Sequence, residues 1–197
     1  PCEVDPRTLQ MDPADVERRI TPRTRALFPV HMNGLSAPMD ELLDIAARHP
    51  HPKYGPLKVI GDAARAVGGG YKGAMIGKRG WMTVFSFQTQ KNMCTLGEGG
   101  AITTDDADLA ERLRKLRFFG GNDSWGSSYL MTSVQAAVGR VQLRKLDRFV
   151  AMRRKVAADR TEMLRDLPEL TLPCEPAGCY HSYYLYTILV PKDWAGE

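Results

Sequence analysis

The residues best suited to chemistry follow two apolar runs in the first half of the chain. Asp62 comes directly after one run, and Ser86 lies near the end of another, five residues before Lys91. A glycine-rich turn at 97–100 closes the second unit, and glycine allows close backbone approach and positive φ. The carboxyl ends of strands are where open α/β sheets bind ligands. Taken singly, Asp62 is more often a helix N-cap and Lys91 a solvated loop lysine, so the hypothesis of a site depends on the joint pattern.

The elements that must position these residues alternate between strand and helix patterns. Four short apolar runs are expected to be strands, at residues 26–30, 57–60, 83–87 and 101–104. Helices are expected at residues 13–20, 39–48, from a cap at Asp105 to a stop at Gly120, and over the long stretch 131–167, with a further strand at 183–190. Strands that alternate with helices indicate an α/β fold with a mostly parallel sheet layered with helices.

Local signals define two of these helices. Asp12 is expected to be an N-cap with Pro13 at the first helical position. Thr21-Pro22 should end this helix near Ile20, because a residue before proline disfavours the helical conformation. In the helix at 39–48, one apolar face is expected to hold Met39, Leu42, Leu43 and Ala46.

The composition is that of an ordinary globular chain of 197 residues. Forty-three per cent is hydrophobic, 25% is charged and the formal net charge is +4, which argues against global disorder and does not require a nucleic-acid partner. No run of about 18 apolar residues exists, so neither a membrane span nor a membrane partner is expected, and the N-terminus shows no signal-peptide pattern. Cations are frequent in 140–165, but interspersed acids favour a solvated helix face over a nucleic-acid surface.

Cysteine and histidine spacing gives no sign of a metal site. The four cysteines form no CxxC pair, and the four histidines supply no matching pair of ligands. Scattered cysteines in a chain of this length are not typical of a disulfide scaffold, so a reducing, cytoplasmic location is expected.

Asp62, Ser86, Lys91 and the turn at 97–100 together resemble the DegT/DnrJ/StrS family of aminotransferases that depend on pyridoxal 5′-phosphate (PLP). Three further segments extend the resemblance over nearly the whole chain: Pro-Val-His-Met-Asn-Gly at 29–34, Tyr-Leu-Met-Thr-Ser-Val-Gln-Ala-Ala-Val-Gly at 129–139, and His-Ser-Tyr-Tyr-Leu-Tyr at 181–186. The resemblance implies the fold type I of PLP-dependent transferases. Family members are roughly twice as long, so an internal fragment is expected.

The resemblance also implies a domain organisation. Residues 1–130 would be part of the large PLP-binding α/β domain, residues 131–167 a long connecting helix, and residues 168–197 the start of a smaller α+β C-terminal domain. A homodimer is implied, with each active site completed across the subunit interface.

The implied activity is transfer of an amino group from glutamate or glutamine to a keto-sugar, often nucleotide-linked, or to a keto-cyclitol. Lys91 would be the catalytic residue, which forms a Schiff base with PLP and requires a neutral amine to do so. Asp62 would pair with the pyridine nitrogen and make the ring an electron sink, and Ser86 would donate to the cofactor phosphate. His31, at a strand end, can equally face the cofactor or serve as a hydrogen-bonded structural histidine.

Three positions depart from the family pattern. Arg65 stands where Gln or His is common and Gln88 where His is frequent. Ser128 replaces a common Asn that reaches the phosphate of the neighbouring subunit's cofactor. The resemblance makes all three candidate cofactor-binding residues and leaves the keto substrate open.

Two other classes of function compete with the aminotransferase. The three departures are also compatible with a non-catalytic or regulatory relative, and within the PLP class a dehydratase or lyase is an alternative. Relatives that lack the lysine act as dehydratases, so Lys91 favours amino transfer. A dinucleotide-binding protein is disfavoured, because no GxGxxG opens a helix after a strand.

Overall fold

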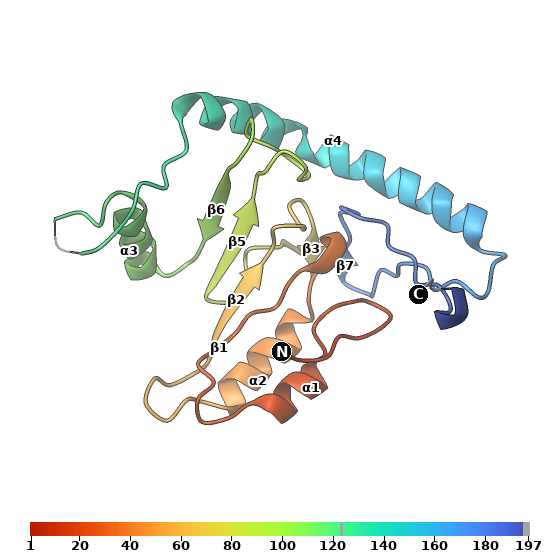
Figure 1. Cartoon of the computed structure of the whole chain (residues 1–197), viewed down its shortest axis with the longest axis horizontal. Helices are drawn as coiled ribbons and strands as arrows, with labels where there is room; N and C mark the ends of the chain where they lie inside the picture. The colour runs from red at the N-terminus through yellow and green to blue at the C-terminus, as the bar shows by residue number, and fades with distance from the viewer. Residues whose placement is uncertain (123, 195–197) are drawn as a thin grey trace.

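A four-stranded mixed sheet forms the centre of the computed structural model, which describes residues 1–122 and 124–194 (Figure 1). Its strands, in spatial order, are β1 (Ala26–Leu27), β2 (Lys58–Asp62), β5 (Met82–Ser86) and β6 (Gly100–Thr103). The first three are parallel, and β6 is antiparallel to β5. The expected mostly parallel sheet is confirmed. Residues 195–197, within the expected C-terminal part, lie outside the described residues.

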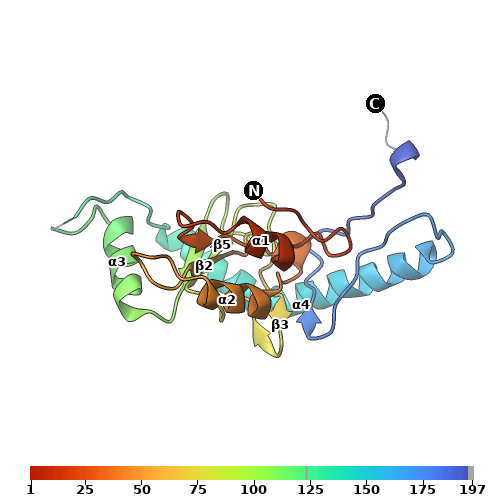
Figure 2. The ribbon, with the colours of Figure 1, turned by 90° about the horizontal axis from the view of Figure 1, so that it is seen from below.

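Two helices contribute to the main apolar core: the second along the chain packs on β1 and β2, and the first packs on the second. They are α1 (Pro13–Arg19) and α2 (Met39–Arg48), which lie next to each other in Figures 1 and 2. The bounds of α2 are those expected from the sequence. Its buried residues are Met39, Leu42, Ile45 and Ala46, so Ile45 takes the place expected for Leu43, which is only half-buried against the same cluster.

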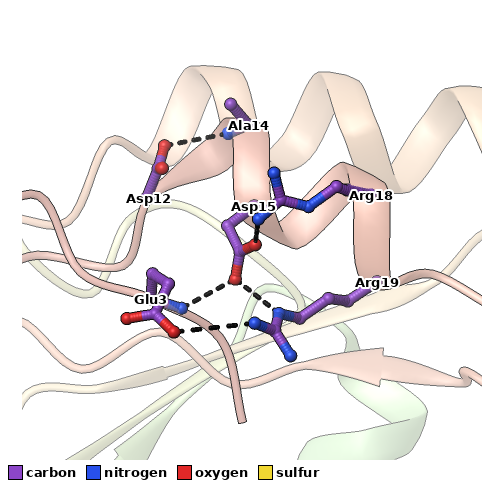
Figure 3. Close-up of polar contacts among 6 residues, drawn as sticks. All are labelled: Glu3, Asp12, Ala14, Asp15, Arg18 and Arg19. Atoms are coloured by element: carbon purple, nitrogen blue, oxygen red, sulfur yellow. Dashed lines mark hydrogen bonds and ion pairs between the residues drawn. The ribbon is translucent and has the colours of Figure 1, made fainter.

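The start of α1 is stabilised by side chains, as Figure 3 shows. Asp12 is the expected N-cap, and its Oδ1 accepts a hydrogen bond from the Ala14 N–H at 3.0 Å. Asp15 is buried, accepts from the Glu3 N–H at 2.8 Å and pairs with Arg18 and Arg19. The Glu3 N–H and then the two guanidinium groups hold the pKa of Asp15 below its ordinary value, although burial opposes them.

Strand β1 is shorter than the expected strand at 26–30. It ends at Leu27, Phe28 is exposed, and the ladder to β2 resumes only at the bridge between Val30 and Asp62. Pro29 interrupts the ladder because proline has no N–H to donate. Its carbonyl still accepts from the Asp62 N–H at 2.8 Å, which keeps the chain beside the end of β2.

The second half of the chain is mainly helical. Helix α3 (Ala107–Arg117) is capped by Asp106, whose Oδ1 accepts from the Leu109 N–H at 2.9 Å, so the expected cap at Asp105 is wrong by one residue. Helix α4 (Ser133–Leu164) starts with a capping box between Thr132 and Gln135. Strands β2 and β5 point toward α4 in Figure 1.

Helix α4 contacts the chain through a narrow apolar seam. Leu146 and Val150 are buried with Val67, from the loop after β2, and with Met93, from the loop after β5. Most cations of this helix are exposed, as expected for a solvated face, but Arg153 and Arg154 contact the segment at 175–184. The seam therefore packs α4 against both loops that carry candidate site residues.

The strand expected at 183–190 is wrong. The only ladder contact of this segment within the described residues is the bridge between Thr171 and Leu189. Tyr183 has a positive φ of 45° and the Leu185 N–H donates to the Asn33 carbonyl, which removes the extended geometry of a strand. A small antiparallel sheet forms earlier instead, from β4 (Ala74–Met75), β3 (Gly70–Tyr71) and β7 (Cys179–Tyr180). Short 3-10 turns are η1 (Met32–Gly34) and η2 (Lys192–Trp194).

Among the described residues, the helices are too short or too polar to cross a membrane. The four cysteines are free thiols, and in the same part of the chain no three acidic, histidine or cysteine side chains come together in a way that could hold a metal ion.

Candidate active site

Asp62 and Ser86 lie at the carboxyl ends of two neighbouring parallel strands. Asp62 pairs with Val84 in the register of β2 and β5, and Ser86 follows Val84 by two residues. Paired residues of a parallel ladder point to the same face of the sheet, and so do residues two apart on one strand. The Asp62 carboxylate and the Ser86 hydroxyl therefore share one face of the sheet.

The backbone around Asp62 is tied down on both sides. The carbonyl of Asp62 accepts from the His31 N–H at 2.9 Å, and the next N–H, of Ala63, donates to Val84 at 2.8 Å. Its Oδ1 accepts from the Ala64 N–H at 2.9 Å. Oδ1 thus caps the turn after β2, whereas the single-residue interpretation predicted a helix N-cap and no helix follows here. Oδ2 has no hydrogen-bond partner among the described residues.

His31 is a buried structural residue beside this strand end. Its Nδ1 accepts from the Ala37 N–H at 3.0 Å. Burial lowers the pKa of His31 to about 4, although the charge of Asp62 opposes the shift, so the imidazole is neutral at pH 7. A Cβ on Gly61 would lie 2.9 Å from His31 Nε2, so glycine at this position makes room for the ring. The structure favours the structural role over the cofactor-facing one.

The loop that carries Lys91 is a folded connection between β5 and β6. The Phe87 N–H donates to the Gly99 carbonyl at 2.7 Å, and the Thr89 N–H donates to the Gly97 carbonyl at 2.8 Å. The Lys91 N–H donates to the Gln88 carbonyl at 2.9 Å. Lys91 is half-buried, and these backbone hydrogen bonds show that it belongs to an ordered loop rather than a free coil.

Ser86 and Gln88 organise the start of this loop. Ser86 Oγ accepts from the Gln88 N–H at 3.3 Å, and Gln88 Oε1 accepts from the Gln90 N–H at 2.8 Å. Both side chains are half-buried. Each uses an acceptor locally, and the Ser86 O–H and the Gln88 amide N–H groups have no acceptor among the described residues.

The other two candidate residues lie further out. Arg65 is exposed, and its Nη1 lies 3.7 Å from Met32 Sδ rather than on Asp62. Ser128 is exposed and bridges to Phe118 at the end of α3. The structure therefore places Asp62 and Ser86 at neighbouring strand ends, with Gln88 and Lys91 in the loop that follows β5. It places Arg65 on an exposed turn and Ser128 on the surface after α3.

Two residues near Lys91 were not singled out from the sequence. Tyr184 places its ring with its centroid 5.4 Å from Lys91 Nζ. Asn92 is buried directly after the lysine and hydrogen-bonds to Val67 and Ser182. Tyr184 belongs to the motif at 181–186 that contributed to the family resemblance. The residue types of this motif do not indicate that Tyr184 lies against the lysine loop.

The comparison with protein families gives a clear assignment. The sequence pattern of the DegT/DnrJ/EryC1/StrS aminotransferase family matches residues 1–195 of this chain, so the chain belongs to this family. The resemblance carried by Asp62, Ser86, Lys91 and the glycine-rich turn is confirmed.

Individual relatives agree with the family. The chain is 38% identical over 197 residues to the pleiotropic regulatory protein of Geobacillus stearothermophilus, with 96% of this chain and 51% of the relative covered. It is 39% identical over 183 residues to a dTDP-3-amino-3,4,6-trideoxy-alpha-D-glucose transaminase of Streptomyces venezuelae, covering 90% and 47%. The chain spans about half the length of the curated relatives it matches.

A solved structure supports the fold at the same level. The crystal structure of S. venezuelae DesV in complex with a ketimine intermediate superposes with a TM-score of 0.91 at 38% identity, covering 98% of this chain and 52% of that one. The fold is therefore that of the PLP-dependent aminotransferases, present as a partial domain, as expected from the sequence.

Proposed function

We propose that the protein carrying this chain is a PLP-dependent aminotransferase with Lys91 as its catalytic residue. The observation that carries this proposal is that Asp62 and Ser86 share one face at neighbouring strand ends, and that the ordered loop leaving Ser86 carries the half-buried Lys91. Family membership supports the same activity.

The residues present fit PLP as a set of donors and acceptors. Lys91 offers a primary amine for the aldehyde, Asp62 offers a carboxylate oxygen for the pyridine nitrogen, and Ser86 offers an O–H for the phosphate. A carboxylate, an amine and a hydroxyl at adjacent strand ends match the three polar ends of this cofactor. When bound, PLP supplies an aldehyde that reacts with primary amines and a ring that withdraws electrons.

Each side chain then has a defined task. Lys91 Nζ holds the cofactor and, when released, moves a proton to and from the substrate carbon. The Asp62 carboxylate holds a proton on the pyridine nitrogen, and its turn-capping hydrogen bond orients it. Ser86 donates to the phosphate. Arg65 and Gln88 are proposed as further donors to the cofactor, and Ser128 as a contact to the phosphate in a partner subunit.

The substrates we propose are glutamate or glutamine as donor and a keto-sugar, nucleotide-linked, or a keto-cyclitol as acceptor. The S. venezuelae relative is named as the transaminase of a dTDP-linked amino sugar, which supports the nucleotide-linked class. We further propose a homodimer with the active site at the subunit interface. A cytoplasmic location agrees with the free thiols of the four cysteines.

The proposal is tested by borohydride reduction of the full-length protein with PLP, followed by peptide mapping. The pyridoxyl label is expected on Lys91. Lys91→Ala should lose both the label and amino transfer, by roughly 10³-fold or more because the nucleophile is absent. Lys53→Ala, which removes an exposed lysine, is the matched control and should change neither. A label on another lysine in the wild-type protein would refute the role of Lys91.

A regulatory protein is the second candidate. The G. stearothermophilus relative carries a regulatory name, and Arg65, Gln88 and Ser128 depart from the family pattern. A protein that is purified with added PLP and acquires no bound cofactor would favour this function. A PLP-loaded protein that releases ammonia or water from the sugar without amino transfer would indicate a lyase or dehydratase.

A further inference from the structure

A buried asparagine connects three segments that are far apart in the sequence. Asn92 is 6% exposed. Its Nδ2 donates to the Val67 carbonyl at 2.8 Å and to Ser182 Oγ at 3.2 Å. Val67 follows Asp62 in the loop after β2, and Ser182 lies beyond α4. One side-chain amide therefore joins the lysine loop to the loop after Asp62 and to the segment at 181–187.

Ser182, at the far end of this connection, is itself held rigidly. It is completely buried, and both its N–H and its Oγ donate to the Gly34 carbonyl, at 2.9 and 3.3 Å. A Cβ on Gly34 would lie 2.4 Å from Ser182 Oγ and 2.9 Å from the Tyr184 N, and Gly34 has a φ of 102°. Glycine is therefore required for this close approach.

The segment fixed in this way also places an aromatic ring at the lysine. The Tyr184 ring centroid lies 5.4 Å from Lys91 Nζ, within the range of a cation–π contact. The Tyr184 carbonyl accepts from Arg153 Nη1 at 3.3 Å, which ties the same residue to α4. The ring stays at the amine only while the segment at 181–187 stays docked on the lysine loop.

We propose that Asn92 is a positioning residue for Lys91, holding its loop against the loop after Asp62 and against the segment that bears Tyr184. This inference rests on the proposed function. The apolar contacts of the neighbouring Met93 hold the loop against the core but do not fix its orientation. The two hydrogen bonds from Nδ2 fix this orientation. Oδ1 has no partner among the described residues.

The first test is Asn92→Asp in the full-length protein. Aspartate keeps the shape but replaces the donor by an oxygen that faces the Val67 carbonyl. PLP should bind roughly 10- to 100-fold more weakly, because two hydrogen bonds are lost. At saturating PLP, the fraction of bound cofactor that borohydride fixes on Lys91 should fall below about half, because the amine is no longer aligned with the aldehyde. Both quantities are measured by absorbance titration and mass spectrometry.

The second test is Ser182→Ala, with Ser36→Ala as its matched control. Ser182→Ala removes one of the two partners of Asn92 and should weaken PLP binding by about 5-fold, with a smaller loss of fixed cofactor. Ser36 is also a buried serine, and its Oγ donates to the Ala37 carbonyl at 2.8 Å, outside this connection. Ser36→Ala should leave the fixed fraction unchanged.

The outcomes separate this inference from the proposed function. If wild-type protein fixes no PLP on Lys91, the proposed function fails. If wild type fixes PLP and both Asn92→Asp and Ser182→Ala fix the same fraction as wild type, only the positioning role is overturned. An equal loss in Ser36→Ala would also overturn it, since the effect would then reflect general destabilisation. If circular dichroism shows that Asn92→Asp does not fold, the fixed fraction of PLP in Ser182→Ala, compared with that in Ser36→Ala, decides whether the positioning role holds.

Discussion

In the proposed function, Asp62 has two tasks for one carboxylate. Oδ1 caps the turn after β2 through the Ala64 N–H, and the second oxygen remains available for a cationic ring nitrogen. The capping function explains why an aspartate in this position is, by itself, a weak indication of a site. Because the two oxygens have separate tasks, an amide in place of the carboxylate separates the structural from the chemical contribution.

Asp62→Asn should keep the fold and lose the reaction. The amide oxygen can still accept from the Ala64 N–H, but the negative charge that holds a proton on the cofactor ring is gone. Amino transfer should fall by about 10²- to 10³-fold, the range found when one preorganised electrostatic group is removed, with an unchanged melting temperature. Asp44→Asn, at an exposed carboxylate on α2, is the control. Full activity of Asp62→Asn would contradict the assigned role.

Sequence reasoning identified the residues whose chemistry is evident from their type. Lys91, Asp62 and Ser86 form a recognisable set because local spacing places Asp62 and Ser86 at strand ends and Lys91 in the loop that follows Ser86. Asn92 and Tyr184 could not be found in this way, because their contacts are distant in sequence. Asn92 bonds to Ser182, 90 residues away, and the Tyr184 ring contacts Lys91 across a similar separation. Arg65 was expected on the cofactor, but the side chain rests on Met32 in the structure.

Among the helices and strands, sequence signals predicted the features that local interactions determine, such as helix bounds and N-caps. The bounds of α2 and the cap at Asp12 follow from helical periodicity and side-chain capping. The cap of α3 was misplaced because Asp105 and Asp106 are equivalent as sequence signals, and hydrogen bonding to Leu109 selects the second. The strand expected at 183–190 failed because the Leu185 N–H donates to the Asn33 carbonyl, and the Ser182 N–H just before the segment donates to the Gly34 carbonyl; no local pattern reveals either bond.

The apolar face of α2 gives a direct stability test. Leu42 is fully buried between α2 and the sheet, so Leu42→Ala should lower the free energy of unfolding by about 2–5 kcal/mol through lost burial and the cavity that remains. Leu43 is only half-buried, and Leu43→Ala should cost less than about half as much. Urea denaturation of both variants measures the difference. Equal losses would show that the observed face of the helix is wrong.

For the whole molecule, two buried histidines link stability to pH. Burial lowers the pKa of His31 to about 4, against the charge of Asp62. Burial also lowers the pKa of His181 to about 4; Glu175 opposes this and Arg154 adds to it. Both rings are neutral when folded, whereas unfolded histidine titrates near pH 6.5. Between these values the unfolded chain binds more protons, so folding weakens as the pH falls.

The free energy of unfolding should therefore drop between about pH 6.5 and pH 4, by up to about 3 kcal/mol for each histidine. Above pH 7 the contribution is complete, and below pH 4 no further loss comes from these groups. His181→Asn, whose amide oxygen can replace Nδ1 as acceptor for the Tyr183 N–H, should remove about half of the slope. Denaturation curves at several pH values measure it. An unchanged slope in His181→Asn would exclude this histidine as a source.

The hydrogen bond between Asn92 and Ser182 closes a loop that includes all of α4. Closing a loop between residues 90 apart costs conformational entropy, which the burial of Asn92 and Ser182 and their hydrogen bonds must offset. The hairpin of β5 and β6 can hold the lysine without this contact, but it cannot by itself keep the Tyr184 ring next to the amine. In the proposed enzyme, release of the coenzyme should therefore be coupled to undocking of residues 181–187.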